Sequence, residues 1–165
     1  GAAFQAVTLR ILDAYMDAPK TDWTAVYAKA VAMQESKADT SWKKHEAARD
    51  KHSKPSLPLS AYAGTYSDPW YGNVDITLHG RHLVMQFSHT AQLLGDMEPW
   101  QNDTFIVRWR DRSLNADAFV TFALDPDGKV REVRMQPISP RTDFSFDFQD
   151  LRLTPVKDTD DSDED

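Results

Sequence analysis

The sequence predicts a mainly β protein with N-terminal helices, in which about eight short antiparallel strands pack around one core. Three observations support this fold class. Residues 61–156 contain five of the six glycines and a series of short apolar runs that alternate with polar residues. These runs recur about every 8 to 12 residues, a spacing typical of a closed barrel or a sandwich. The first 50 residues instead repeat apolar side chains at three- and four-residue intervals, as amphipathic helices do.

Residues 1–50 are predicted to be a helical linker segment that contains two helices. Pro19 separates them, because proline breaks a helix, and Thr21 or Asp22 can cap the second helix by accepting a backbone hydrogen bond. Neither helix can bury its apolar stripe alone, so each needs a partner surface within this chain or on a neighbouring domain. The stripes consist of Phe4, Val7, Ile11, Leu12 and Tyr15 in the first helix and Trp23, Val26, Tyr27, Ala30 and Met33 in the second.

Residues 51–60 are predicted to be a linker, since Pro55 and Pro58 interrupt regular structure there. The β-barrel domain is expected to cover residues 61–156. Two turns are marked clearly within it. Gly80 supplies the positive φ of a tight hairpin, and residues 125–129 place proline and glycine where a turn favours them.

The alternating runs define the expected strands and their inward faces. Large side chains take most inward positions, so we expect an interior that is mostly filled by side chains rather than hollow. The strands are expected at residues 62–66, 74–78, 83–87, 92–97, 105–109, 119–124, 130–135 and 144–153. The large inward side chains are Phe87, Phe105, Trp109, Phe122, Phe144, Phe146 and Phe148.

Three aromatic residues are expected in loops rather than in strands. Trp70 and Tyr71 follow Pro69, and Trp100 follows Pro99. Loop tryptophans can surround the mouth of a pocket or contact a neighbouring domain. Trp70, Tyr71 and Trp100 are therefore candidate rim residues for ligand binding. The alternative is that they fold over an open end of the barrel and plug it.

The charge balance excludes some classes of function. The chain has 26 acidic and 19 basic side chains and a net charge of −7. Six of the carboxylates lie within the last eight residues, and residues 157–165 are predicted to be a disordered acidic tail. A nearly neutral domain with an acidic tail is a poor partner for nucleic acid. No apolar run approaches about 20 residues, so no membrane span is expected.

No catalytic group, metal site or cofactor is predicted. The chain has no cysteine, which excludes disulfides and Cys-based zinc sites. Ser41 and Lys44 match the Ser-x-x-Lys pattern of serine–lysine hydrolases, but chance alone produces about one such match in this composition. Counting along strands places His79 on the opposite face from His82 and His89, so the three are not expected to converge on a metal.

Eight short motifs follow one another in a recognisable order. They are Leu59-Ser-Ala-Tyr62-Ala-Gly64-Thr-Tyr66, Tyr71-Gly72-Asn73-Val74, Gly80-Arg-His-Leu83, Gly95-Asp96-Met97-Glu98-Pro99-Trp100, Asp103-Thr104-Phe105, Trp109-Arg110-Asp111, Phe119-Val-Thr-Phe122 and Asp125-Pro-Asp-Gly128-Lys-Val130. No single motif is specific. Their order and spacing together resemble the uncharacterised C-terminal domain of bacterial β-lactamase-related serine hydrolases across residues 59–154. Residues 4–50 are similar to the segment that leaves the hydrolase domain and the linking helix beyond it.

The resemblance implies a lipocalin-like antiparallel barrel and a non-catalytic accessory role. The nucleophile of such enzymes lies in an upstream catalytic domain of the same polypeptide, and this chain would modulate substrate access to that domain or its assembly. The resemblance also implies an extracytoplasmic location, periplasmic or secreted, in a bacterium. A homo-oligomer is a further partner that the sequence allows. The alternative function is a carrier that holds a small apolar ligand in the barrel, which the large inward side chains disfavour.

Overall fold

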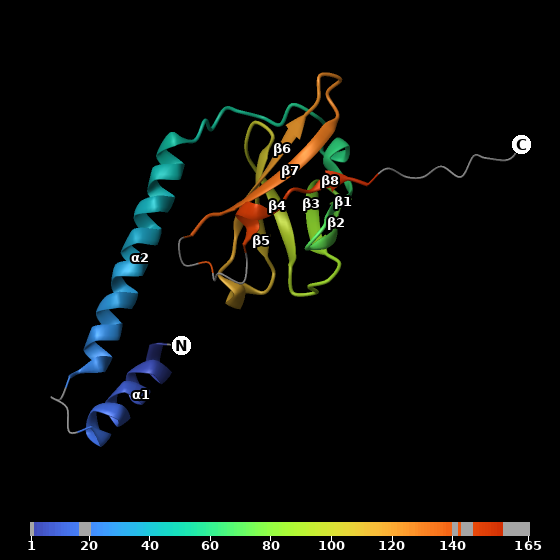
Figure 1. The fold of residues 1–165 in the computed structure, drawn as a ribbon. Coiled ribbons are helices and arrows are strands. Elements are labelled where there is room, and N and C mark those ends of the chain that lie inside the picture. Colours follow the sequence, from blue (N-terminus) through green and yellow to red (C-terminus); the bar gives the residue numbers. More distant parts are fainter. Residues whose placement is uncertain (1, 17–20, 140–141, 143–146, 157–165) are drawn as a thin grey trace, which may run out of the picture.

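The computed structural model describes residues 2–16, 21–139, 142 and 147–156, and it contains one antiparallel sheet of eight strands that follows two helices (Figure 1). From β1 to β7 each strand pairs with the next along the chain, and β1 also pairs with β8, so the order is β7-β6-β5-β4-β3-β2-β1-β8. The strands are β1 (Gly64–Asp68), β2 (Gly72–His79), β3 (His82–Phe87), β4 (Leu94–Gln101), β5 (Thr104–Trp109), β6 (Ala118–Leu124), β7 (Val130–Pro137) and β8 (Thr154–Pro155).

The sheet closes almost completely into a barrel. Val133 of β7 and Leu153, the residue before β8, exchange two backbone hydrogen bonds of 2.8 and 3.1 Å. The two outer strands of the sheet thus meet, which covers edges that would otherwise be open to pairing with another chain. The predicted mainly β fold with N-terminal helices is confirmed, and of the two arrangements that strand spacing allows, the barrel is the one observed.

Aromatic rings fill the described interior of the barrel. Tyr62, Phe105 and Phe122 pack edge to face with ring centres 4.9 to 5.5 Å apart. Phe87, Trp109 and Phe148 form a second group at 6.0 to 6.4 Å. The expected filling is confirmed for Phe87, Phe105, Trp109, Phe122 and Phe148, all buried, while Phe144 and Phe146 lie outside the described residues. This packing gives the carrier hypothesis no support.

Two turns agree with the predictions made from glycine. Gly80 has a φ of 61° in the hairpin whose closing pair is His79 and His82. Gly128 has a φ of 77° in the turn that Asp125 closes by exchanging hydrogen bonds with Lys129 and Gly128. Both conformations are ones that residues with a Cβ rarely adopt, so local sequence is enough to define them.

Alternation of apolar residues predicts strands at Tyr62 and Phe148, and both predictions are wrong. Tyr62 belongs to a short 3₁₀ helix, η1 (Leu59–Tyr62), and the first strand begins only at Gly64. Phe148 belongs to another such helix, η3 (Phe148–Asp150), although its ring is buried as predicted. In both cases the ring reaches the core from a 3₁₀ helix and not from a strand. Alternation of apolar residues identifies strands only, so it cannot predict this.

Trp100 lies in β4, so its predicted position in a loop is wrong. Pro99 does not end this strand, because the pairing of β4 with β3 stops at Met97 and its register against β5 shifts between Pro99 and Gln101. A proline is tolerated where no ladder hydrogen bond requires its missing N–H.

Two helices precede the barrel: α1 (Ala2–Tyr15) and α2 (Trp23–Ala48). Asp22 caps α2 by accepting a hydrogen bond of 3.1 Å from the backbone N–H of Ala25, as predicted. Figure 1 shows α1 folded back along the first part of α2, and the barrel beside the last part. Neither α1 nor α2, the α-helices in the described part of the chain, is long and apolar enough to cross a membrane.

Residues 51–60 run along the β4–β5 hairpin and are joined to it by hydrogen bonds. Ser56 donates from its backbone N–H and its hydroxyl to the carboxylate of Asp103, at 2.8 and 2.6 Å. The Tyr62 hydroxyl donates to the same carboxylate and accepts from the N–H of Leu57. Burial and then the bond to Asp103 raise the pKa of Tyr62 to about 12. This segment therefore fixes α2 to the barrel.

Candidate functional site

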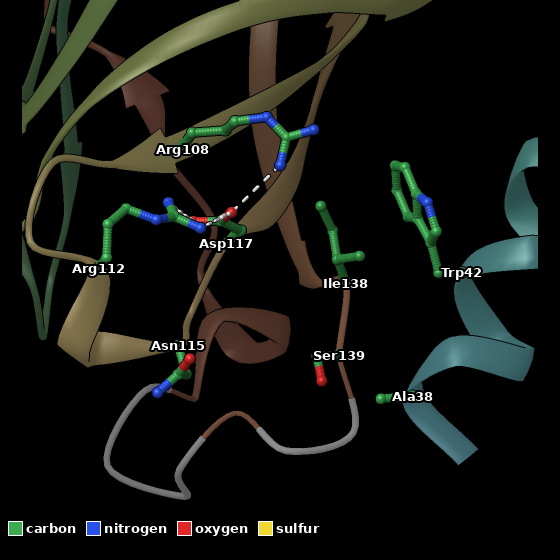
Figure 2. A pocket seen from close by; sticks show the side chains of 8 residues that line it. All are labelled: Ala38, Trp42, Arg108, Arg112, Asn115, Asp117, Ile138 and Ser139. Carbon is green, nitrogen blue, oxygen red and sulfur yellow. Dashed lines mark hydrogen bonds and ion pairs between the residues drawn. The ribbon is translucent and has the colours of Figure 1, made fainter. Parts of the chain in front are cut away.

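A groove with a volume of about 350 Å³ lies between α2 and the outside of the barrel (Figure 2). Its residues come from three parts of the chain: α2, the end of β5 with the connection to β6, and the segment after β7. They are Ala38 and Trp42, then Arg108, Arg112, Asn115 and Asp117, then Ile138 and Ser139. The groove therefore exists only because α2 packs against the barrel.

An apolar cluster on the outer surface of the barrel holds α2 in place. Trp100, Ile106 and Phe119 are buried there, with Trp42 and Ile138 packed against them. The ring of Trp100 lies 5.3 Å from that of Trp42 and 5.5 Å from that of Phe119. Ile106 and Phe119 occupy outward-facing positions of β5 and β6, where solvent would normally favour polar side chains. The helix covers them and forms the apolar wall of the groove.

The polar wall is organised by Asp117, whose side chain is 16% exposed. Arg112 donates to both of its carboxylate oxygens at 2.8 and 2.9 Å, and this pairing raises the pKa of the arginine. Arg112 also donates to the carbonyl of Trp109 at 3.0 Å. Arg108 reaches the same carboxylate at 3.3 Å and that of Glu98 at 3.4 Å. Two guanidinium groups thus share one partly buried carboxylate in the groove.

The structure does not bring the three candidate rim residues together. Consecutive turns of the meander alternate between the two barrel ends, so the β1–β2 turn of Trp70 and Tyr71 is at the opposite end from Trp100, next to the β4–β5 turn. Trp70 is 92% exposed, whereas Tyr71 is half-buried, its ring 6.3 Å from that of Phe87. Trp100 is buried beneath α2.

Asp68 holds the turn that presents Trp70. Its carboxylate accepts hydrogen bonds from the N–H groups of Trp70, Tyr71 and Arg152 at 2.8, 3.1 and 3.0 Å. Burial acts to raise the pKa of Asp68, but the backbone hydrogen bonds outweigh it and lower that pKa. This buried charge is satisfied by the fold and has a structural role.

The histidines do not lie on the faces that counting residues along the strands predicts. His79 and His82 are directly paired across the β2–β3 hairpin and therefore share a face, with ring centres 6.4 Å apart. The prediction that they point to opposite faces is wrong, because parity does not carry through a turn. His89 packs against Gly72 at the other barrel end. Within the described ranges, no three His, Asp or Glu side chains are grouped as a metal would need.

A second candidate surface is the helical hairpin of α1 and α2. Small side chains bring the two helices together, with Ala6 buried between them and Asp13 accepting a hydrogen bond from the indole N–H of Trp23. The remainder of α1 exposes large apolar side chains: Phe4, Val7, Ile11, Leu12 and Tyr15, with Met16 just beyond its end. Apart from Met16 these are the residues of the predicted first stripe, and all of them are exposed rather than packed on the barrel.

No curated protein matches the sequence. The crystal structure of the C-terminal domain of a penicillin-binding protein is similar over 66% of this chain and 98% of its own, with a TM-score of 0.45 and 22% sequence identity. A family model described as a domain of unknown function, DUF3471, matches residues 48–155. That range includes every strand of the barrel and confirms the resemblance to an uncharacterised domain family. The chain belongs to the DUF3471 family.

Proposed function

We propose that this chain is a non-catalytic accessory unit of a β-lactamase-type serine hydrolase, and that α1 contacts the catalytic domain of the same polypeptide. One observation carries the proposal: α1 has a broad apolar surface, yet α2 covers only the part around Ala6. Its exposed fractions are 75% for Phe4, 62% for Ile11 and 91% for Tyr15. An amphipathic helix normally buries its apolar stripe against a partner surface.

Burying the exposed apolar side chains of α1 would release a large free energy. Full burial of one such side chain contributes about 1.5–3 kcal/mol, so a contact that covers several of them competes well with the cost of association. Contiguous apolar patches on a soluble surface generally mark interaction sites. The choice of occupant rests on the sequence resemblance of residues 4–50 to the segment that leaves the hydrolase domain, a region that precedes the DUF3471 match at residues 48–155.

The ionisable groups support a structural use of their charges rather than acid–base catalysis. Each carboxylate with a lowered pKa in the described residues accepts hydrogen bonds that hold a turn, join two strands, fix the 51–60 segment or, for Glu132, pair it with Arg134 of its own strand. These are Asp68, Asp96, Asp103, Asp111 and Glu132. Ser41 and Lys44 lie on α2, where the Ser-x-x-Lys match is a helical surface feature.

The fixed junction between α2 and the barrel explains how a contact of α1 with the catalytic domain would affect the enzyme. If α1 contacts the catalytic domain, the rigid α2 and the bonded 51–60 segment place the barrel at a defined position beside that domain. The barrel can then limit which substrates reach the catalytic site, or stabilise the assembled enzyme. An extracytoplasmic location is part of the same proposal, and fractionation of the native cells tests it.

A matched pair of substitutions in the full-length polypeptide tests the contact. Ile11→Asp places a charge on the exposed apolar face of α1, whereas Gln5→Asp adds the same charge at an exposed polar position of the same helix. We expect Ile11→Asp alone to change kcat/KM for small esters or D-amino-acid peptides, or the thermal stability of the catalytic domain. Equal behaviour of both variants, together with unchanged specificity, stability and oligomeric state after deletion of residues 61–156, would contradict the proposal.

A further inference from the structure

We infer that the groove between α2 and the barrel binds a small ligand in which a carboxylate is joined to an apolar group. The groove has one cationic wall and one apolar wall, and its volume of about 350 Å³ lies within the range of small-molecule sites, about 300–1,000 Å³. This inference does not depend on the proposed accessory function, since it concerns residues that α1 does not contact.

Arg108 is the group expected to bind the carboxylate. Its contacts to Asp117 and Glu98, at 3.3 and 3.4 Å, are longer than the roughly 2.7–2.9 Å of strong charge-assisted hydrogen bonds. Its Nη2 has no hydrogen-bond partner among the described residues. Figure 2 shows the Arg108 guanidinium extending over the groove toward the side where Trp42 lies. A donor is therefore available to an incoming anion.

Arg112 and Asp117 pair mainly with each other, so they are not the groups expected to bind the ligand. Arg112 forms the shorter, two-pronged contact with Asp117 and thereby offsets most of the negative charge of that carboxylate. Arg108 is left with Glu98, which is 65% exposed and does not line the groove. One positive charge in the groove is thus weakly compensated. The two nearby carboxylates disfavour a dianion such as phosphate, so a single carboxylate suits the site better.

The apolar wall is already in place before any ligand arrives. Trp42 is fixed by its contact with Trp100, and Ile138 packs against the same cluster. Ala38 has only a methyl group, so it leaves space beside the indole. A rigid aromatic wall next to an arginine fits an aryl or alkyl group attached directly to a carboxylate.

The test uses two probes of nearly the same shape, the anionic N-acetyl-phenylalanine and its neutral amide, titrated into the ¹⁵N-labelled chain. We expect saturable shifts of the Trp42 indole resonance and of residues 108–117 with the acid, and a Kd on the order of 1 mM. The amide should bind at least about tenfold more weakly, because it lacks the charge-assisted hydrogen bond. No saturable shift, or equal binding of acid and amide, would overturn the inference.

Variants separate the groove from general charge effects. Arg108→Gln should weaken acid binding about tenfold, while Arg110→Gln should not change it. Arg110 lies two residues along and pairs with Asp96 at 2.9 Å, outside the groove. Glu98→Gln should tighten binding a few fold, since it releases Arg108, and this gain cannot result from misfolding. An equal effect of the two arginine variants, or no gain from Glu98→Gln, would contradict the assignment.

Discussion

The guanidinium of Arg49 lies 4.3 Å from the centre of the Trp100 ring, and its Nε donates a 2.8 Å hydrogen bond to the carbonyl of the same residue. Arg49 directly follows α2, and Trp100 is near the end of β4. The pair therefore joins the helical segment to the barrel at one point. A second bond of 3.3 Å from Arg49 to the carbonyl of Pro99 strengthens this junction.

Arg49→Ala should weaken the junction between α2 and the barrel. The substitution removes a cation–π contact and two hydrogen bonds from a charged donor, so we expect the free energy of unfolding to fall by about 1–3 kcal/mol. Urea denaturation measures this change, and hydrogen exchange should accelerate in the last turns of α2. Arg81→Ala, at an exposed hairpin position, is the control. A loss no larger than that of the control would show that Arg49 does not fix the helix.

Two tryptophans distinguish the filled barrel from its surface. Trp109 is 1% exposed and donates its indole N–H to the carbonyl of Ala116 at 2.7 Å, whereas Trp70 is 92% exposed. Trp109→Ala should cost about 3–5 kcal/mol of unfolding free energy. Trp70→Ala should change it by less than about 0.5 kcal/mol. Thermal denaturation of both variants checks this, and similar losses would mean that the interior is not packed as described.

Gly72 should be harder to replace than Gly128, although both have a positive φ, of 72° and 77°. A Cβ on Gly128 would meet nothing within 4 Å, whereas one on Gly72 would lie 2.5 Å from the ring of His89. Gly128→Ala should cost about 1–2 kcal/mol for its conformation alone. Gly72→Ala should cost more by the amount needed to turn the exposed His89 ring away. In a His89→Ala background the excess should disappear. If it persists in the double variant, the clash is not its cause.

Asp68 should make stability depend on acid pH. Its pKa is lowered in the folded state, so its contribution is complete above its unfolded pKa of about 3.9 and is lost as pH falls through the folded value. The stability difference between wild type and Asp68→Asn should therefore shrink from pH 7 toward pH 2. Urea denaturation across that pH range measures this difference. Asp127→Asn, a substitution at an exposed turn position, is the control. A difference that stays constant with pH would exclude this linkage.

The features that sequence predicts well are local. The cap at Asp22 and the glycine turns at Gly80 and Gly128 depend on a few neighbouring residues, and each is found where expected. Strand periodicity likewise gives the correct inward rings, because a barrel buries every second side chain. Tyr62 shows the limit, since its ring fills the core from outside any strand.

The groove could not be predicted, because it depends on contacts distant in sequence. Trp42 contacts Trp100, which lies 58 positions later in the sequence. Asp117 forms ion pairs with Arg108 and Arg112 only once the β5–β6 connection has folded. One signal was present in the sequence. The outward positions of Ile106 and Phe119 are apolar, which indicates a covering element but does not say that α2 provides it.

Hydrogen exchange of α1 tests the proposed docking most directly. The amides of residues 4–15 would be measured in the chain of 165 residues alone and in the full-length polypeptide that contains the catalytic domain. Docking predicts exchange at least about tenfold slower for α1 in the full-length protein, with the barrel strands unchanged. Equal exchange of α1 in both proteins would contradict a contact between this helix and the catalytic domain.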